Sequence, residues 1–215
     1  MSLQPIIVFD SGIGGLSIYR PLRHSLPAAN VIYIADQQYF PYGDKTEVWI
    51  KARFVTLSMQ FTALHPLLVV IACNTATLNA VTYLRSILSC PVVGVEPVIK
   101  PLSGYQRALA LMTTVSATSV STAKLLKQYG PHVRVFTPQG LASAIEYNDY
   151  DQVKKSIHEI KELVRKYQIE AIGLSCTHYA LIINEFKRQI PGVVFIDPSP
   201  AVVKEVHRVL KSSPV

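Results

Sequence analysis

Two cysteines have the surroundings most suggestive of chemistry in this chain. Cys73 follows the apolar run VVIA and opens the segment CNTAT, and Cys176 follows AIGLS and opens CTHY. Each stands where a strand is expected to end and a helix to begin, and the amide groups and dipole of a helix start favour a thiolate. Although a lone cysteine is more often an inert buried thiol, two thiols in matching places favour a chemical role over a structural one.

The remaining candidates near these thiols are open to several interpretations. His178 could be a nucleophile's base, a proton partner of a thiol or a helix-capping residue. Cys90, in LSCPVV, has no comparable polar neighbours and is interpreted as structural. The odd, widely spaced set of three cysteines without a CxxC argues against a disulfide framework and a zinc cluster. No lysine follows a strand beside a glycine-rich turn, so no pyridoxal phosphate is expected.

A glycine-rich segment, VFDSGIGG, follows the first apolar run. It resembles the first half of a dinucleotide fingerprint, with Asp36 near the distance of a ribose-binding acid. Asp10, however, would direct a negative charge at a pyrophosphate, and a serine replaces the third glycine. A plain glycine turn feeding a helix is one alternative. We favour another, in which the turn lets backbone N–H groups approach a small anion at the helix start, through Gly12, Gly14 and Gly15.

Composition excludes several classes of protein. Of 215 residues, 49% are hydrophobic and 16% charged, which is typical of a folded globular chain. The apolar runs are far shorter than the roughly 20 residues of a membrane span, and the N-terminus lacks the features of a signal peptide. A cytoplasmic protein without a membrane partner is therefore expected. The net charge of +7 is scattered along the chain, so nucleic-acid binding is not expected either.

Short β-branched runs alternate with longer periodic segments, which predicts an α/β fold with buried parallel strands. A helix is expected at 150–167, where apolar residues step by three and four, and another begins at Pro200 with Ser199 as its N-cap. The segment GVEPVIKPLSG divides the chain into two lobes, 1–97 and 98–211. The strands are expected at 5–9, 31–35, 67–72, 92–95, 108–112, 133–136, 171–174 and 193–196.

Ligands of such sheets bind beyond the carboxyl ends of the strands. The polar residues at those ends should therefore gather in a cleft between the lobes. They lie in the segments DSGIGG, ADQQYFPYG, CNTAT, TT and CTHY.

Four segments together resemble the glutamate racemase family of the aspartate/glutamate racemase superfamily: VFDSGIGGLS, YIADQQYFPYG, VIACNTAT and LSCTHY. They occur in the family's order and span most of the chain. The resemblance implies two similar lobes with the site between them, no cofactor or metal, and glutamate as substrate, with D-glutamate supplied to peptidoglycan. It also implies a possible homodimer and a usual C-terminal tail that packs on the first lobe, which is expected to be missing here.

The same resemblance implies roles for individual residues. Cys73 and Cys176 would be the catalytic acid/bases, with Asp10 assisting Cys73, and His178 and Glu146 assisting Cys176. The substrate would be held by Ser11, Pro41, Tyr42, Gly43, Asn74, Thr75, Thr114 and Thr177.

Two alternatives stay open. The first is a related racemase acting on aspartate, a hydantoin or another small acid. It is motivated by Ala110 and Ala117, which stand in the threonine loop where the family usually has glycine and threonine. The second is a non-catalytic protein that binds a small acid or a nucleotide, motivated by VFDSGIGG and by the expected missing tail.

Overall fold

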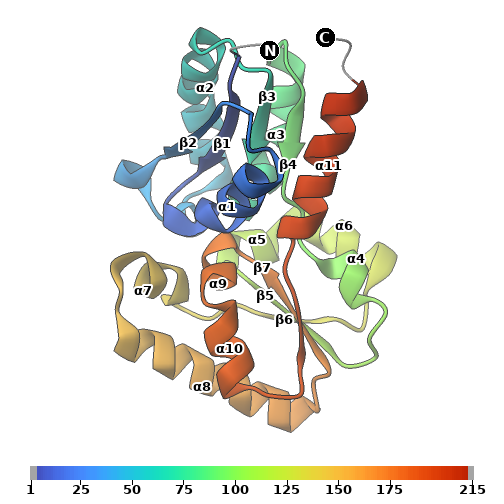
Figure 1. The fold of residues 1–215 in the computed structure, drawn as a ribbon. Helices are drawn as coiled ribbons and strands as arrows, with labels where there is room; N and C mark the ends of the chain where they lie inside the picture. Colours follow the sequence, from blue (N-terminus) through green and yellow to red (C-terminus); the bar gives the residue numbers. More distant parts are fainter. Residues whose placement is uncertain (1–3, 213–215) are drawn as a thin grey trace.

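The apolar runs form two parallel four-stranded sheets, stacked with their carboxyl ends toward each other (Figure 1). The structure is a computed structural model that describes residues 4–212. The first sheet has the order β2-β1-β3-β4 and the second β6-β5-β7-β8, so both follow one topology. The strands are β1 Ile6–Asp10, β2 Val31–Ala35, β3 Leu68–Ile71, β4 Val92–Gly94, β5 Ala108–Met112, β6 Arg134–Phe136, β7 Ala171–Ser175 and β8 Val194–Ile196. The α/β prediction is confirmed, with strand limits within one residue of those expected.

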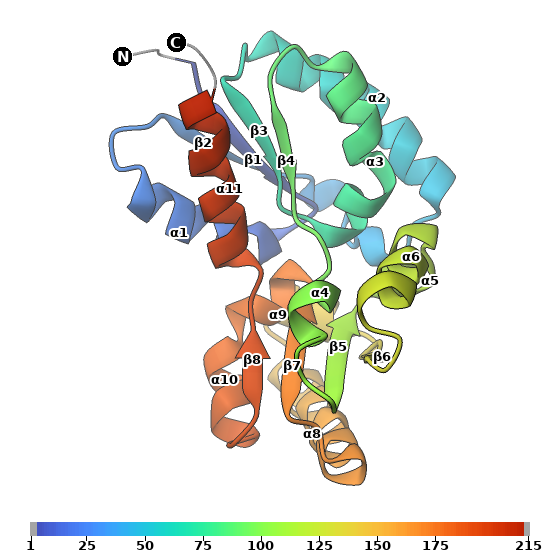
Figure 2. The same ribbon diagram turned by 90° about the vertical axis from the view of Figure 1, so that its right-hand side faces the viewer.

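Helices cover both faces of each sheet (Figures 1 and 2). On the first sheet, α1 (Leu16–Ser25) and α11 (Ser199–Ser212) pack on one face, and α2 (Glu47–Ala63) and α3 (Asn74–Ile87) pack on the other. On the second sheet, one face carries α7 (Leu141–Tyr147), α8 (Tyr150–Tyr167), α9 (Thr177–Leu181) and α10 (Ile183–Gln189). The opposite face carries α4 (Ile99–Leu102), α5 (Thr114–Thr118) and α6 (Val120–Tyr129). The 3-10 turns η1 (Ile13–Gly15), η2 (Gln37–Tyr39) and η3 (Tyr42–Asp44) follow strands of the first sheet.

The helix α8 spans the range expected from its periodicity. Its apolar face buries Ile157 and Ile160 against the second sheet. The Asp149 carboxylate caps its start by accepting a hydrogen bond from the backbone N–H of Gln152 at 3.0 Å. Gln168 closes it in the left-handed conformation, with φ of 49°.

The last helix differs from the sequence prediction in its start. It begins at Ser199 instead of Pro200. The Asp197 carboxylate accepts hydrogen bonds from the Ser199 N–H at 2.9 Å and from its hydroxyl at 2.6 Å. Asp197 thus does the capping that the sequence suggested for Ser199, because its side chain lies one turn ahead of the free N–H groups.

The same helix also belongs to the other lobe. It packs against α1, with Val202 and Val206 buried beside Ile6 and Val8 of the first sheet (Figure 2). The expected second lobe of residues 98–211 therefore loses its last helix to the first. The chain crosses between the sheets twice, near 95–98 and again near 197–198, and these crossings lie side by side.

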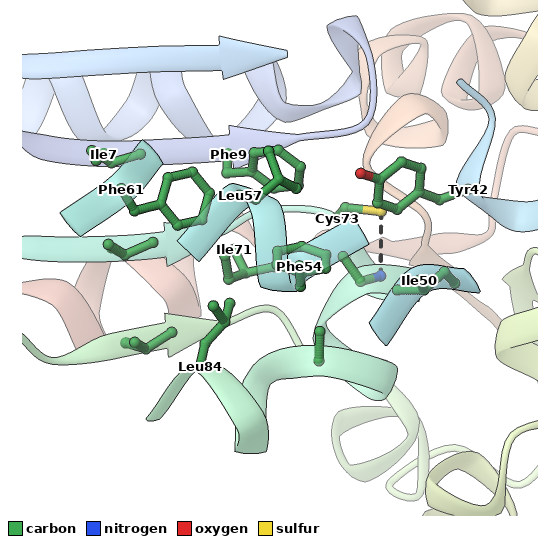
Figure 3. Packing of buried hydrophobic residues seen from close by; sticks show 14 residues of the cluster. Ile7, Phe9, Tyr42, Ile50, Phe54, Leu57, Phe61, Ile71, Cys73 and Leu84 are labelled. Carbon is green, nitrogen blue, oxygen red and sulfur yellow. Dashed lines mark hydrogen bonds between the residues drawn. The ribbon is translucent and has the colours of Figure 1, made fainter. Parts of the chain in front are cut away.

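An aromatic cluster fills the space between the first sheet and α2. The ring of Phe9 meets Phe54 edge-on at 5.2 Å and Phe61 at 5.6 Å between centroids. Tyr42 and Cys73 lie at the end of this cluster nearest the second sheet (Figure 3). The sulfur of Cys73 therefore borders an apolar core. None of the helices within residues 4–212 has the length and hydropathy needed to span a lipid bilayer.

Candidate active site

Equivalent strand ends of the two sheets supply the two cysteines. Cys73 follows β3, whose neighbour β1 ends in Asp10, and Cys176 follows β7, whose neighbour β5 leads into Thr113. Because the carboxyl ends of the two sheets face each other, both thiols line one pocket. The sequence prediction that one thiol comes from each lobe into a shared cleft agrees with this geometry.

This pocket, named here the thiol pocket, is a narrow cavity of about 20 Å³. That volume has room for about one water molecule, so an amino acid can occupy it only after the walls move apart. Its walls combine both thiols with hydroxyl, amide and aromatic groups: Ser11, Phe40, Pro41, Tyr42, Gly43, Cys73, Asn74, Thr75, Thr113, Ala142, Cys176, Thr177 and His178. No group of three or more His, Cys, Asp or Glu side chains within residues 4–212 is placed to hold a metal ion.

Three predicted site residues lie outside this wall. Asp10 and Glu146 lie behind it, where they contact residues that line it. Thr114 lines a neighbouring pocket instead, and Thr113 takes its expected place. The reason is local: Thr113 is the N-cap of α5, with its side chain turned to the Ser116 N–H, whereas Thr114 is the first helical residue and points away.

A short chain of polar groups connects Cys73 to Asp10. The Ser11 hydroxyl lies 3.8 Å from the Cys73 sulfur and donates to the Asp10 carboxylate at 3.3 Å. Asp10 also accepts hydrogen bonds from the Gly12 N–H at 3.1 Å and, across the cleft, from the Thr177 hydroxyl at 2.9 Å. This arrangement gives Cys73 a route for proton exchange with a carboxyl group.

Burial dominates the acidity of this side of the site. It raises the pKa of Asp10, and burial together with the Asp10 charge raises the pKa of Cys73 well above its ordinary value. The sequence prediction that the helix start would favour a Cys73 thiolate is therefore wrong. The Ala76 N–H does point at the sulfur, at 3.5 Å, but one weak bond does not outweigh the loss of hydration (Figure 3).

An imidazole and a carboxylate stand beside Cys176. The Nε2 atom of His178 lies 2.5 Å from the Glu146 carboxylate, and both side chains are almost completely buried. Burial works to lower the pKa of His178, but its interactions with Cys176 and Glu146 outweigh it and raise the pKa to about 10. His178 is therefore an imidazolium at neutral pH and places a positive charge next to the Cys176 sulfur.

Glu146 is held by groups from both lobes. It accepts from the Ile13 N–H at 2.9 Å and from the Gln37 side-chain amide, in addition to His178. Burial works to raise the pKa of Glu146, but these hydrogen bonds outweigh it and keep the pKa below its ordinary value. Phe40 covers the imidazole of His178, with ring centroids 5.0 Å apart.

The N–H groups of the glycine-rich turn bind carboxylates of the protein itself instead of an external anion. The Gly12 N–H donates to Asp10 and the Ile13 N–H to Glu146, so internal carboxylates take the donors that the sequence assigned to a bound ion. A Cβ atom at Gly14 would overlap the His178 ring, and one at Gly12 would overlap the Glu146 carboxylate. The glycines are thus needed for the close approach of the second lobe.

The loop that carries Pro41, Tyr42 and Gly43 is anchored by a buried ion pair. The Asp36 carboxylate accepts two hydrogen bonds from the Arg53 guanidinium, at 2.7 and 2.9 Å, and one from the Tyr42 hydroxyl at 2.5 Å. A bidentate pair of this kind fixes orientation. Asp36 therefore positions the pocket wall, and no contact assigns it the ribose-binding role considered from the sequence.

Hydroxyl groups join the lobes on the far side of the thiol pocket. Thr75 lies 3.0 Å from Thr113 and 3.0 Å from Ser116, and these two lie 2.9 Å from each other. The Asn74 side chain is 3% exposed, and its carbonyl oxygen has no hydrogen-bond partner within residues 4–212. A buried acceptor without a partner is costly in a folded protein, which suits a position where a ligand donates.

Several residues of the site were not given a role from the sequence. Phe40, Thr113 and Ala142 line the thiol pocket, and Gln37 and Ile13 bind Glu146 behind it. The position of Thr113 at a strand end was a usable signal, since it belongs to the TT pair noted there. The other contacts depend on how the two sheets face each other.

Comparison with known proteins identifies the family to which this chain belongs. Residues 18–206 match the Asp/Glu/Hydantoin racemase family. The chain is 34% identical to the glutamate racemase of Aliivibrio fischeri over 98% of this chain and 82% of the relative. Among solved structures it is similar to Escherichia coli glutamate racemase in complex with L-glutamate and the activator UDP-MurNAc-ala, with a TM-score of 0.86 and 28% identity over 99% of this chain and 84% of that one.

A second solved structure shows the same fold with the opposite enantiomer. It is the glutamate racemase of Francisella tularensis in complex with D-glutamate, with a TM-score of 0.85, 28% identity, and coverage of 98% of this chain and 82% of that chain. The family match covers most of the chain and agrees with the paired thiols at equivalent strand ends. The chain therefore belongs to the Asp/Glu/Hydantoin racemase family.

Proposed function

We propose that this protein interconverts L- and D-glutamate without a cofactor, with Cys73 and Cys176 as the acid/base pair. The observation that carries the proposal is that both thiols line one narrow pocket while each has a different proton partner behind it. Family membership and the glutamate named for the relatives support the choice of substrate.

The reaction needs one base and one acid on opposite faces of the α-carbon. One sulfur, as thiolate, removes the α-proton, and the electron pair left on carbon is delocalised into the substrate carboxylate. The other sulfur, as thiol, delivers its proton to the opposite face. No redox partner is consumed, and the two sulfurs finish with exchanged protonation states.

The surroundings of the thiols suit these roles. The raised pKa of Cys73 keeps it a thiol at neutral pH, so it is the proton donor of the resting enzyme. The imidazolium of His178 can stabilise negative charge on Cys176, which makes Cys176 the first base. After turnover the protons exchange with solvent: Cys73 regains one, with Ser11 and Asp10 beside it as hydrogen-bonding groups, and Cys176 releases one, with the positive charge of His178 favouring its thiolate.

Polar wall residues are assigned to the charged groups of the substrate. The unpartnered carbonyl oxygen of Asn74 accepts a hydrogen bond from the substrate ammonium. The hydroxyl groups of Ser11, Thr75 and Thr177 and the backbone of Pro41, Tyr42 and Gly43 surround the rest of the molecule. Each hydrogen-bond donor aimed at the negative charge that develops in the transition state lowers the activation free energy by about 3 to 4 kcal/mol. Thr114 lies outside the pocket, where its hydroxyl accepts a hydrogen bond from the Gln139 amide at 3.3 Å, so Thr113 replaces it as the proposed substrate contact.

The proposal includes a cellular role in the cytoplasm, the supply of D-glutamate for peptidoglycan, which rests on the resemblance to the family. A homodimer is part of the same expectation. Aspartate is the second candidate substrate, because the matched family includes aspartate and hydantoin racemases as well.

Isotope exchange tests the proposal. In deuterated water each enantiomer of glutamate and of aspartate is incubated with the protein, and the product is analysed by chiral separation and mass spectrometry. Early D-glutamate formed from L-glutamate should carry deuterium at the α-carbon while the remaining L-glutamate stays largely protonated. Product that retains the substrate hydrogen would exclude two separate bases. Turnover of aspartate but not glutamate would transfer the proposal to the second candidate.

A further inference from the structure

Glu146 is a buried carboxylate whose hydrogen-bond donors come from opposite lobes. His178 approaches from α9 of its own lobe, whereas Gln37 and the Ile13 N–H approach from the first lobe. Donors to the ionised form stabilise a carboxylate. Two of the three groups that keep Glu146 charged are therefore present only while the lobes are close together.

Gln37 is well placed to make this contact reproducibly. It follows Asp36, which the Arg53 guanidinium holds through two hydrogen bonds. The residue is partly open to solvent at the mouth of the cleft, and its amide reaches inward to Glu146. Its neighbour Gln38 is also exposed, but its side chain has no hydrogen-bond partner within residues 4–212.

The thiol pocket, at about 20 Å³, is too small for an amino acid unless the lobes separate. Separation must break the bonds from Gln37 and Ile13 to Glu146, since these donors and their acceptor lie on different lobes. In the open form, Glu146 and His178 keep their hydrogen bond to each other, and solvent replaces the donors from the first lobe. Movement of the lobes back toward each other restores the two donors.

We propose that Gln37 is a positioning residue that acts through Glu146: its amide binds Glu146 across the cleft and ties the charged state of the Glu146–His178 pair to closure of the lobes. Gln37 touches neither sulfur, so its influence is limited to the face of the site served by Cys176. This inference rests on the proposed racemisation and names a residue to which the family resemblance assigned no role.

The groups that face this pair come from several elements. Tyr33 on β2 and Asp10 on β1 face it from the first lobe, and Cys176 adjoins His178. Gln37 itself is neutral. A glutamate in its place would set two carboxyl groups at hydrogen-bond distance, and one of such a pair holds its proton to a higher pH.

The test compares Gln37→Glu with Gln38→Glu, which adds the same charge one residue away. The dependence of kcat/KM on pH is measured for both and for the unmodified protein. Gln37→Glu should lower the ratio of kcat/KM at pH 8 to kcat/KM at pH 6 by about tenfold relative to the unmodified protein. At pH 6 the two carboxyl groups share one proton and carry the single negative charge of Glu146 alone, whereas at pH 8 the second carboxylate offsets the positive charge of His178 beside Cys176. Gln37→Ala should shift the profile in the opposite direction by a few-fold, because loss of a hydrogen-bond donor raises the pKa of Glu146 and lowers the rate at pH 6. Gln38→Glu should follow the unmodified profile.

The two faces of the site separate positioning from general damage. In a Cys73→Ala background only Cys176 can exchange the α-hydrogen, and in a Cys176→Ala background only Cys73 can. Gln37→Glu should change the pH dependence of exchange in the first background and leave the second unchanged. Loss of rate that is independent of pH, or an equal effect of Gln38→Glu, would overturn the proposal.

A spectroscopic measurement keeps the inference independent of activity. The imidazole resonance of His178 is identified by its loss in His178→Gln and followed from about pH 5 to 8. Gln37→Glu should add an inflection that the unmodified protein and Gln38→Glu lack, because the carboxyl pair titrates in that range. Absence of the inflection refutes the contact. Absence of racemisation with the inflection present refutes the proposed function alone.

Discussion

The two cysteines occupy equivalent positions in two sheets of the same strand order, yet their neighbours differ in charge. Cys73 borders an aromatic core (Figure 3). It also lies near the Asp10 carboxyl and is connected to it by Ser11. Cys176 lies next to the imidazolium of His178, which a buried carboxylate supports. The same strand order therefore places the Cys73 thiol where it keeps its proton and the Cys176 sulfur beside a positive charge.

This difference shows how a repeated fold can carry out an asymmetric reaction. The strand ends bring both sulfurs to the same pocket. In the proposed mechanism, the side chains behind them decide which sulfur starts as the acid. The carboxyl group behind each thiol also accepts a hydrogen bond from the opposite lobe, Asp10 from Thr177 and Glu146 from Gln37. The protonation states are therefore properties of the closed pair of lobes.

Removal of either sulfur should have the largest effect. Cys73→Ala and Cys176→Ala should each reduce racemisation in both directions by at least about 10³-fold, since general acid and base groups contribute on that scale and the cycle needs both. Circular dichroism serves as the control for folding. Near-normal turnover by Cys176→Ala would mean that the two sides of the site are not partners.

The rate at which Cys73 reacts with an alkylating agent tests whether its thiol keeps its proton at neutral pH. In a Cys90→Ala/Cys176→Ala protein, alkylation of Cys73 by iodoacetamide at neutral pH should be about 10²-fold slower than that of free cysteine, because burial and Asp10 raise its pKa. Adding Asp10→Asn should speed the reaction, since the like charge is removed. Mass spectrometry across a pH series measures both rates, and a plateau below pH 8 would contradict the assignment of Cys73 as the resting acid.

The charged pair behind Cys176 should make stability depend on pH. The pKa of His178 is raised to about 10, so the stabilisation is fully present below about pH 6.5, the ordinary histidine value, and is lost as the pH rises toward 10. Each unit by which the pKa of His178 in the folded protein exceeds its pKa in the unfolded chain corresponds to about 1.4 kcal/mol in the free energy of unfolding. Urea unfolding at pH 6, 8 and 10 should show this decline, and Glu146→Gln should flatten it. An equally steep decline in Glu146→Gln would assign the effect to another group.

The smallest effect is expected at the third cysteine. Cys90 packs against the edge of the first core and has no polar partner near the pocket. Cys90→Ala should leave kcat/KM within about twofold and reduce the free energy of unfolding by about 1 kcal/mol, as for a small change at a half-buried position. A large loss of turnover would mean that Cys90 also takes part in the reaction.

Much of the fold follows from local sequence. The β-branched runs marked all eight strands within residues 4–212, because a strand buried on both faces needs continuous apolar residues. The spacing of apolar residues marked α8, and the placement of Cys73 and Cys176 at strand ends marked the pocket. These features depend on neighbours in the chain, so a pattern of a few residues is sufficient to identify them.

The tertiary structure decided the partners of those residues. Thr177 reaches Asp10 across 167 positions of sequence, and Ile13 reaches Glu146 across 133. The side of the sheet taken by α11 and the contact of Gln37 with Glu146 likewise depend on packing between segments far apart in the chain. The pKa of Cys73 shows the physical reason: the helix start that favours a thiolate is a local feature, whereas the burial that outweighs it comes from packing against residues far away in the chain.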